Sequence, residues 1–162
     1  MTKKTKEAHA VLDRYDRAIL RIVQRDNKTP QRSIAEEVNL SAAAVQRRIA
    51  AMEAAGVIAG NVALVDADAV SATITAIVEV QLQDERAATV DRAKALFRAT
   101  AEVQQCYYVT GGVSFVLIIV APDMRSYEKL TRRLFAESEF IDSYRTLVAL
   151  DRVKTGTSIT IP

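Results

Sequence analysis

Residues 29–60 place the strongest constraint on the fold, because local signals along them agree on two short helices joined by a tight turn. Pro30 suits the first turn of a helix, where its missing N–H is not needed, and Thr29 can cap that helix. Asn39 tolerates the left-handed conformation that ends a helix, and Ser41 is a preferred N-cap for the next one. The stretch therefore predicts a helix-turn-helix.

The second of these helices has one apolar face and one free face. At 100° per residue, Val45, Ile49 and Met52 fall together and face a core. The free face carries Ala43, Gln46 and Arg47, with Arg48 on its flank. A helix-turn-helix places such a helix in the DNA major groove with its N-terminal residues nearest the base edges. An ordinary helical hairpin with a solvated outer face would show the same pattern and is the alternative.

A third helix and a connecting segment complete the N-terminal half. Apolar residues recur at helical spacing over residues 12–25, which gives the hairpin a third helix to pack against. We therefore expect a DNA-binding domain at residues 1–60, of which 1–10 form a mobile tail. A hinge strand and linker are expected at 61–72.

The remaining residues, 73–162, alternate between strand-like and helical patterns in the order β-α-β-β-α-β, which is typical of a ferredoxin-like domain. The fold class is therefore α+β, and the last six residues, TSITIP, can add an edge strand. Helices on one face of such a sheet leave the other face uncovered. Because a large exposed apolar face is unusual in a monomer, we expect a homodimer through this domain.

Charge and cysteine content narrow the function. Residues 1–62 carry 11 basic and 7 acidic residues, whereas 63–162 carry 11 and 13, which mildly favours a polyanion partner for the first half. Cys106 and His9 are single residues of their kinds, so no Cys/His metal cluster or Ser-His-Asp triad can form within the chain. We expect Cys106 to be buried, no metal or cofactor, no enzymatic activity, no membrane span and a cytoplasmic location.

The sequence resembles the Lrp/AsnC (leucine-responsive/asparagine-regulator) transcription factors along nearly its whole length. The resemblance lies in five fragments in matching order: LDRYDRAIL at 12–20, LSAAAVQRRIAAMEAAGVIAG at 40–60, VTG at 109–111, PDMRSYEKL at 122–130 and DRVKT at 151–155. It implies a winged-type helix-turn-helix that binds double-stranded DNA and a ferredoxin-like domain that dimerises and senses small molecules, often amino acids. It also implies assembly of homodimers into larger rings, commonly octamers.

The resemblance also assigns site residues. The positions that match the family's DNA-facing residues are Ser41, Ala43, Gln46, Arg47 and Arg48. The positions that match its effector region are Thr110, Gly111, Gly112, Val113 and Ser114, with Tyr144 and Thr146 approaching from a neighbouring subunit. A plain hairpin also needs glycines at this turn, so that reading stays open beside the effector site.

Ser114 departs from the family pattern, because members that bind amino acids often have Asp at this position. A carboxylate pairs with a ligand's ammonium group more strongly than a hydroxyl does. The effector is therefore an amino acid, another small molecule or none. The alternative function is a ligand-binding or oligomerising protein with weak or non-specific DNA binding.

Overall fold

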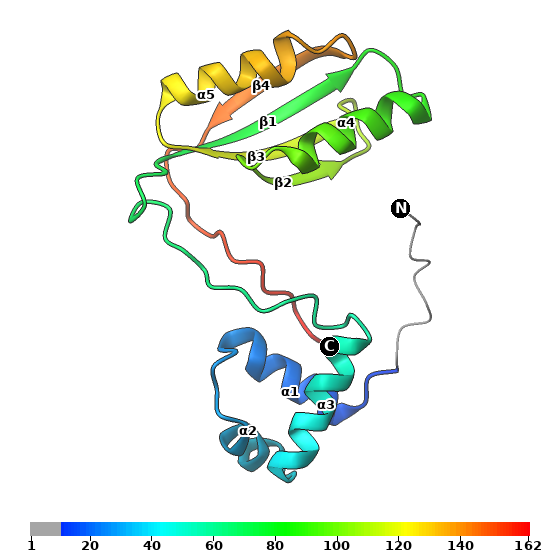
Figure 1. Ribbon diagram of the computed structural model, residues 1–162, viewed down its shortest axis with the longest axis vertical. Coiled ribbons are helices and arrows are strands. Elements are labelled where there is room, and N and C mark those ends of the chain that lie inside the picture. The colour runs from blue at the N-terminus through cyan, green and yellow to red at the C-terminus, as the bar shows by residue number, and fades with distance from the viewer. Residues whose placement is uncertain (1–10) are drawn as a thin grey trace. The chain divides into compact units, whose positions relative to one another are not determined.

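The computed structural model describes residues 11–162, which divide into two compact units. The first comprises the chain up to Ala63 together with Thr155–Pro162, and the second is Leu64–Lys154 (Figure 1). The expected mobile tail and His9 lie outside the described residues. Within residues 11–162, no helix is long and apolar enough to cross a membrane.

Three helices form the first unit: α1 (Arg14–Arg25), α2 (Gln31–Val38) and α3 (Ala42–Ala54). Each buries one stripe against the other two, as the helical spacing predicts. The buried residues are Ile19, Leu20 and Ile22 from α1, Ile34, Ala35 and Val38 from α2, and Val45 and Met52 from α3. The predicted three-helix module is confirmed.

The helix ends follow the predicted capping residues with one exception. Asn39 adopts the left-handed conformation with φ of 55°, and the Ser41 hydroxyl accepts a hydrogen bond from the backbone N–H of Ala44 at 3.2 Å. The N-cap predicted at Thr29 is wrong, because its hydroxyl donates to the backbone carbonyl of Asp26 at 2.8 Å instead. The N-cap position of α2 is Pro30, whose side chain contains no atom that could accept a capping hydrogen bond.

The second unit has the predicted β-α-β-β-α-β order, and its sheet is antiparallel with the strand order β2-β3-β1-β4. The apolar run of β3 therefore lies centrally, as its composition predicts. The elements are β1 (Ile74–Leu82), α4 (Ala87–Ala99), β2 (Val103–Tyr108), β3 (Phe115–Ala121), α5 (Met124–Thr131), a π-helical turn η1 (Arg132–Ala136) and β4 (Ile141–Val148).

Both helices of the second unit cover the same face of the sheet (Figure 1). Alternate strand residues point into this core, among them Val78 of β1 and Leu117 of β3, both fully buried. The residues between them face the other side. This open face carries the apolar side chains of Ile77, Val116, Ile118, Val120 and Leu147, and a two-pronged ion pair of Arg145 with Glu79 at 2.9 and 3.0 Å.

Two expectations about the connecting segments differ from the structure. Residues 61–72 form no strand in the described chain, since a strand requires a partner, and the regular feature there is a turn at 67–71. The final segment, 155–162, adds no edge strand to the sheet. It belongs to the first unit instead.

Contacts with α1 explain the position of this final segment. The Gln24 side chain donates to the carbonyl of Ile159 at 2.7 Å and accepts from the N–H of Ile159 at 3.0 Å. Arg21 donates to the carbonyls of Ile161 and Pro162 at 3.2 and 3.0 Å. The Ile161 side chain packs against the helical core. A sequence pattern of alternating apolar residues cannot distinguish such docking from strand pairing.

Ile161→Ala is expected to destabilise the first unit by about 1–2 kcal/mol, because a partly buried isoleucine contributes less than a fully buried one. Faster hydrogen exchange across α1, measured by mass spectrometry, would report this loss. Ile159→Ala is the matched control: its side chain is exposed, so the stability should change by less than about 0.5 kcal/mol. Equal effects of the two substitutions would contradict a role for Ile161 in the core.

Candidate nucleic-acid interface and effector region

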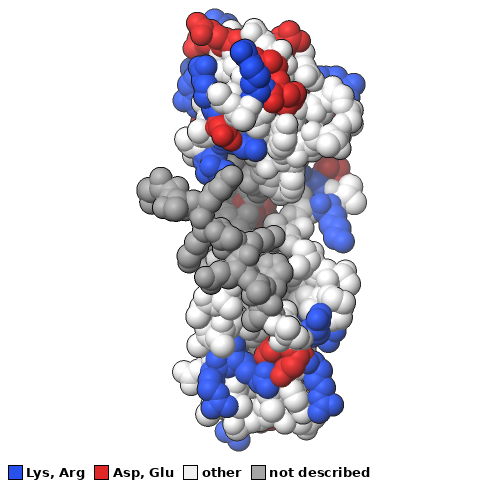
Figure 2. Space-filling view, turned by 90° about the vertical axis from the view of Figure 1, so that its right-hand side faces the viewer, with Lys and Arg blue, Asp and Glu red and all other residues white. Residues whose placement is uncertain are grey.

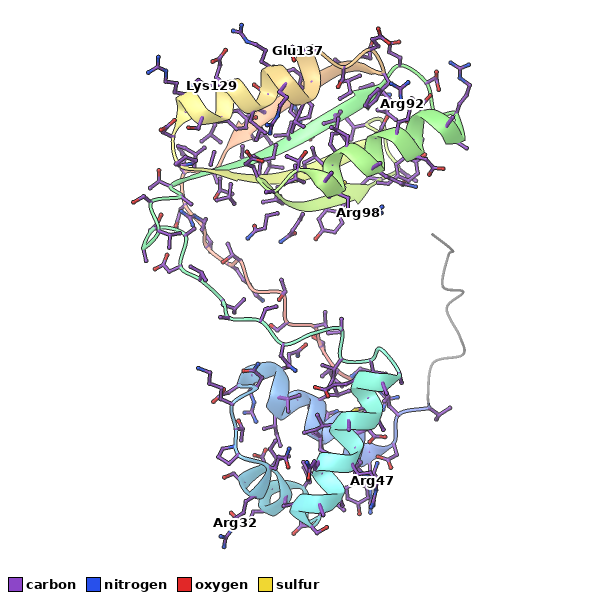
Figure 3. All side chains as sticks on the ribbon, viewed as in Figure 1. Arg32, Arg47, Arg92, Arg98, Lys129 and Glu137 are labelled. Atoms are coloured by element: carbon purple, nitrogen blue, oxygen red, sulfur yellow. The ribbon has the colours of Figure 1, made fainter. Side chains whose placement is uncertain are left out.

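The free face of α3 is solvent-exposed at every position expected from the sequence except Arg48. Ser41, Ala43, Gln46 and Arg47 are exposed, and Arg47 points away from the helical core (Figure 3). Within residues 11–162, the side chains of Gln46 and Arg47 form no hydrogen bond or ion pair with protein groups. An amide and a guanidinium therefore stand side by side with their donors available.

Arg48 is instead tied to the start of α1. Its Nη1 lies 2.7 Å from Oδ1 of Asp16 and 2.9 Å from Oδ2 of Asp13, and its guanidinium lies over the Tyr15 ring at 5.5 Å. The bond to Asp16 is the main reason why the pKa of Arg48 is raised. The Arg48 side chain is 29% exposed and that of Asp16 is 15% exposed, so these bonds are partly shielded from water. Arg48 holds α3 against α1.

The same two acids cap α1. The Asp13 carboxylate accepts from the backbone N–H groups of Tyr15 and Asp16 at 2.8 and 2.9 Å, while Asp16 accepts from the N–H of Asp13 at 3.1 Å. This reciprocal arrangement is a capping box. The backbone bond from Asp16 is the largest cause of the lowered pKa of Asp13. One cluster therefore both starts α1 and fixes α3.

Two other arginines of this unit have acidic neighbours. Arg32 lies 3.4 Å from Glu36 and Arg25 lies 3.6 Å from Glu37, both pairs being exposed. Figure 2 shows Lys and Arg side chains around a small acidic patch on part of this surface. Exposed pairs of this kind contribute little to stability and break readily for a stronger partner. Arg47 needs to break no such pair.

In the second unit, the turn between β2 and β3 has the backbone that its two glycines predict. Gly111 and Gly112 have φ of 110° and 100°, values that other residues rarely adopt. A Cβ atom at either position would meet no atom within 4 Å. The glycines are therefore required by conformation, and space beside them is open.

Ser114 closes this turn and is almost completely buried. Its hydroxyl accepts from the backbone N–H of Leu82 at 3.0 Å and donates to the carboxylate of Glu85 at 2.5 Å. The Tyr108 hydroxyl donates to the other oxygen of the Glu85 carboxylate at 2.8 Å, and this bond is the main reason why the pKa of Tyr108 is raised. The exposed residue Glu85 thus brings a carboxylate to the turn.

Sequence reasoning does not find Glu85, because it lies in a loop 29 residues away from Ser114 and belongs to no motif. The loop is held in place by its neighbour Asp84. This carboxylate accepts from the backbone N–H of Arg86 at 3.0 Å and from the hydroxyl of Thr89 at 2.7 Å. The Arg86 guanidinium is the main reason why the pKa of Asp84 lies well below its usual range.

The two expected effector residues of β4 lie on the helix side of the sheet. The Tyr144 ring packs on Phe135 with centroids 4.7 Å apart, and the hydroxyls of Thr146 and Tyr127 are 2.6 Å apart. Within the single chain, these contacts do not bring Tyr144 or Thr146 to the glycine turn. An approach from a neighbouring subunit stays a prediction.

Two family models match the chain. Residues 12–59 match winged helix-turn-helix DNA-binding domains, and residues 75–159 match the Lrp/AsnC ligand binding domain. The chain belongs to the Lrp/AsnC family. It is a transcriptional regulator of that type and not an enzyme.

Individual relatives agree with this assignment over nearly the whole Lrp/AsnC chain. An HTH-type transcriptional regulator of Sinorhizobium fredii is 44% identical, covering 93% of this chain and 89% of the relative. The crystal structure of an AsnC family transcriptional regulator from Agrobacterium tumefaciens is 32% identical, with a TM-score of 0.86 and coverage of 92% and 97%. A feast or famine regulatory protein from M. tuberculosis complexed with L-methionine is 28% identical, with a TM-score of 0.84 and coverage of 93% and 99%.

In this Lrp/AsnC regulator, Arg48→Ala is expected to lower the stability of the first unit by about 1–2 kcal/mol, because the partly buried Asp16 carboxylate and the exposed Asp13 carboxylate lose their cationic partner. Urea unfolding monitored by hydrogen exchange in α1 and α3 would measure the loss. Arg47→Ala, one position away and exposed, should change the stability by less than about 0.5 kcal/mol.

The effect of Arg48→Ala should depend on pH. The backbone N–H of Asp16 is the main reason for the lowered pKa of Asp13, and the hydrogen bond and charge of Arg48 lower it further. The stability that Arg48 adds through Asp13 is complete at neutral pH and is lost as the pH falls from the ordinary carboxyl pKa through the lowered one. The difference between the native protein and Arg48→Ala should therefore shrink in acid. A difference that is independent of pH down to acid unfolding would contradict the ionic role of the cluster.

Proposed function

We propose that this regulator binds specific DNA sites by inserting α3 into the major groove, where Gln46 and Arg47 contact base edges. The observation that carries the proposal is the pair of unpartnered donors on a helix that Arg48 fixes from behind. Arg commonly bonds guanine and Gln commonly bonds adenine in the major groove. Ser41 and Ala43 lie at the N-terminal end of α3, nearest the DNA, where the hydroxyl reaches a phosphate and the methyl group fits a thymine methyl.

The open face of the sheet supports a homodimer. Its apolar side chains, Ile77, Val116, Ile118, Val120 and Leu147, would gain free energy on burial against a second copy. A two-fold axis pairs identical patches, and it also gives the complex two copies of α3. The DNA site proposed for it is therefore palindromic or nearly so.

Further association of these dimers into an octamer belongs to the same proposal, as does a cytoplasmic location beside the chromosome. An octamer carries more recognition helices than a dimer and therefore binds clustered DNA sites with higher apparent affinity. Once one helix is bound, the others meet the neighbouring sites at a high effective concentration. The mass of the particle in solution, measured by light scattering, separates a dimer from an octamer.

The small molecule that we propose as effector is an amino acid, bound beside the glycine turn Thr110–Ser114. A similar protein from M. tuberculosis is complexed with L-methionine. In this chain, Ser114 has both its hydrogen-bonding roles filled, so Glu85 supplies the carboxylate for the ligand's ammonium group. Space is open beside Gly111 and Gly112, where a Cβ atom would meet no neighbour, and backbone N–H groups at this turn would suit the ligand's carboxylate.

A second candidate is a ligand-binding or oligomerising protein whose DNA binding is weak or non-specific. Ala43, which has no hydrogen-bonding side chain, favours it. Non-specific binding depends on phosphate contacts alone and falls steeply with salt, whereas base contacts retain a preference for one sequence. Titration of specific and unrelated DNA at two salt concentrations distinguishes the candidates.

Arg47→Ala is expected to weaken binding to a specific operator by about 1–3 kcal/mol and to relax preference at one base position. Gel-shift titration on DNA upstream of the protein's own gene, with unrelated competitor, measures both effects. Arg125→Ala is the control: it removes an exposed cation from α5 in the second unit. Equal weakening on all sequences would make Arg47 a phosphate contact, and no weakening would remove it from the interface.

Glu85→Gln is expected to weaken binding of an amino-acid effector by about tenfold or more, because a neutral amide replaces a carboxylate beside an ammonium group. Calorimetric titration with L-methionine and a panel of other amino acids measures the change. Asp91→Asn is the matched control: it removes an exposed carboxylate from α4. Unchanged affinity in Glu85→Gln would place the ligand elsewhere.

A further inference from the structure

A groove of about 390 Å3 lies within the second unit, between α4 and the edge strand β2. Its floor is aromatic: Phe97 and Phe115 are 1% and 0% exposed, and their rings meet edge to face with centroids 5.3 Å apart. Val103 and the Tyr108 ring extend this apolar surface. The volume is in the range of sites for small organic molecules.

Two cations border the groove, and no acidic residue among residues 11–162 lines it. Lys94 and Arg98 lie one turn apart on α4, with Nζ of Lys94 4.7 Å from the centre of the Tyr108 ring. Neither cation forms an ion pair with a carboxylate in the part of the chain that the structure describes. An apolar cavity with two unpaired cations at its border matches an anion that carries an apolar body.

We propose that this groove binds a small organic carboxylate with an aromatic or branched aliphatic body. The carboxylate lies beside Lys94 and Arg98, and the body packs on Val103 and the Tyr108 ring, above the buried Phe97 and Phe115. Removal of the ligand's apolar body and of the Tyr108 ring from water supplies hydrophobic free energy, and two charge-assisted bonds set the orientation. The groove offers an amino group no carboxylate partner, so acids without an ammonium group fit it better than amino acids do.

The groove also differs from the proposed effector turn in the groups that it uses. Tyr108 belongs to both: its ring lines the groove and its hydroxyl bonds Glu85. An acid in the groove therefore contacts the residue that holds Glu85, which gives it a route to influence the turn. Its binding does not require Glu85, and the two sites are separable by substitution.

Cys106 gives a direct measurement of occupancy. It is the one cysteine of the chain, it lines the groove, and it is exposed, so the expected buried thiol is a prediction that the structure contradicts. The reason is the position of β2 at the edge of the sheet. Partial burial raises the pKa of its thiol, which the charges of Arg98 and Lys94 oppose. Slow alkylation is therefore expected at neutral pH, and a ligand in the groove should slow it further.

The test measures alkylation of full-length protein by N-ethylmaleimide, followed by intact mass, with phenylacetate, phenylpyruvate and 4-methyl-2-oxopentanoate as probes. Phenylacetamide and phenethylamine are the neutral and cationic controls. Each variant is compared with its own rate without ligand, because removing a cation also changes the thiol pKa. Calorimetric titration with the same probes measures binding that leaves the thiol uncovered.

At least one acid should slow alkylation severalfold or give a saturable heat, and phenylacetamide should do neither. Arg98→Gln and Lys94→Gln should each raise the concentration required by about tenfold. Arg92→Gln is the matched control: Arg92 lies on the same helix (Figure 3). Its guanidinium, however, lies over the Phe140 ring, 5.0 Å from the centroid. It should leave binding unchanged.

Binding should also survive in Glu85→Gln, whether or not that variant responds to amino acids. The proposal fails if no acid protects Cys106 or gives heat. It also fails if phenylacetamide acts as well as phenylacetate, or if Arg92→Gln weakens binding as much as Arg98→Gln does. If Glu85→Gln abolished acid binding while Arg98→Gln and Lys94→Gln did not weaken it, the acid would bind at the effector turn, and the proposal of a separate site would be wrong.

Discussion

The one-sided cover of the four-stranded sheet is the constraint from which the rest of the regulator's organisation follows. α4 and α5 bury one face, and the alternation of β1 and β3 places a second apolar set on the other. An isolated Glu79–Arg145 pair crosses that face and leaves most of it apolar. A face of this kind is best covered by its own copy, since a two-fold axis matches each apolar residue with an apolar region. In the proposed dimer, the two-fold axis also provides two copies of the helix-turn-helix.

Local signals predicted most of the fold, and contacts between distant residues account for the differences. Asn39 ended one helix and Ser41 began the next as expected, because their preferences are set by their own backbone and the next few residues. The prediction that Thr29 caps α2 was wrong because its hydroxyl donates a hydrogen bond to the backbone carbonyl of Asp26 instead. The docking of the final segment depends on Gln24, 135 residues away, which no periodicity can indicate.

The site could be predicted only in part, for the same reason. The positions of Gln46 and Arg47 on the helix were enough to predict that they are exposed. Arg48, the next residue, instead turns toward Asp13 and Asp16. The sequence of α3 alone cannot predict these contacts, because both carboxylates belong to the start of α1. At the turn, the Ser114 hydroxyl already bonds the Leu82 N–H and the Glu85 carboxylate, and Glu85 is the exposed residue of this group; the role of Ser114 in effector binding stays a prediction. A family pattern compares one position with its equivalent, so it cannot find a group that arrives from another loop.

Within one copy of the chain, the effect of a ligand bound to the second unit can be transmitted to the first unit only through the few segments that connect them. The chain leaves the first unit after Ala63 and returns to it at Thr155, so two segments join the units in each copy. Within the second unit, the ends of these segments are tied together: the Arg152 guanidinium pairs with Asp68, and the N–H of Ala149 donates to the carbonyl of Thr75 at 2.8 Å. A ligand acts only through its different affinities for two arrangements. For the effector proposed above, the two arrangements would differ either in these paired segments or in the proposed association of copies through the sheet. In the first case the segment around Ile161, which contacts α1, is the covalent connection through which the difference would reach that helix.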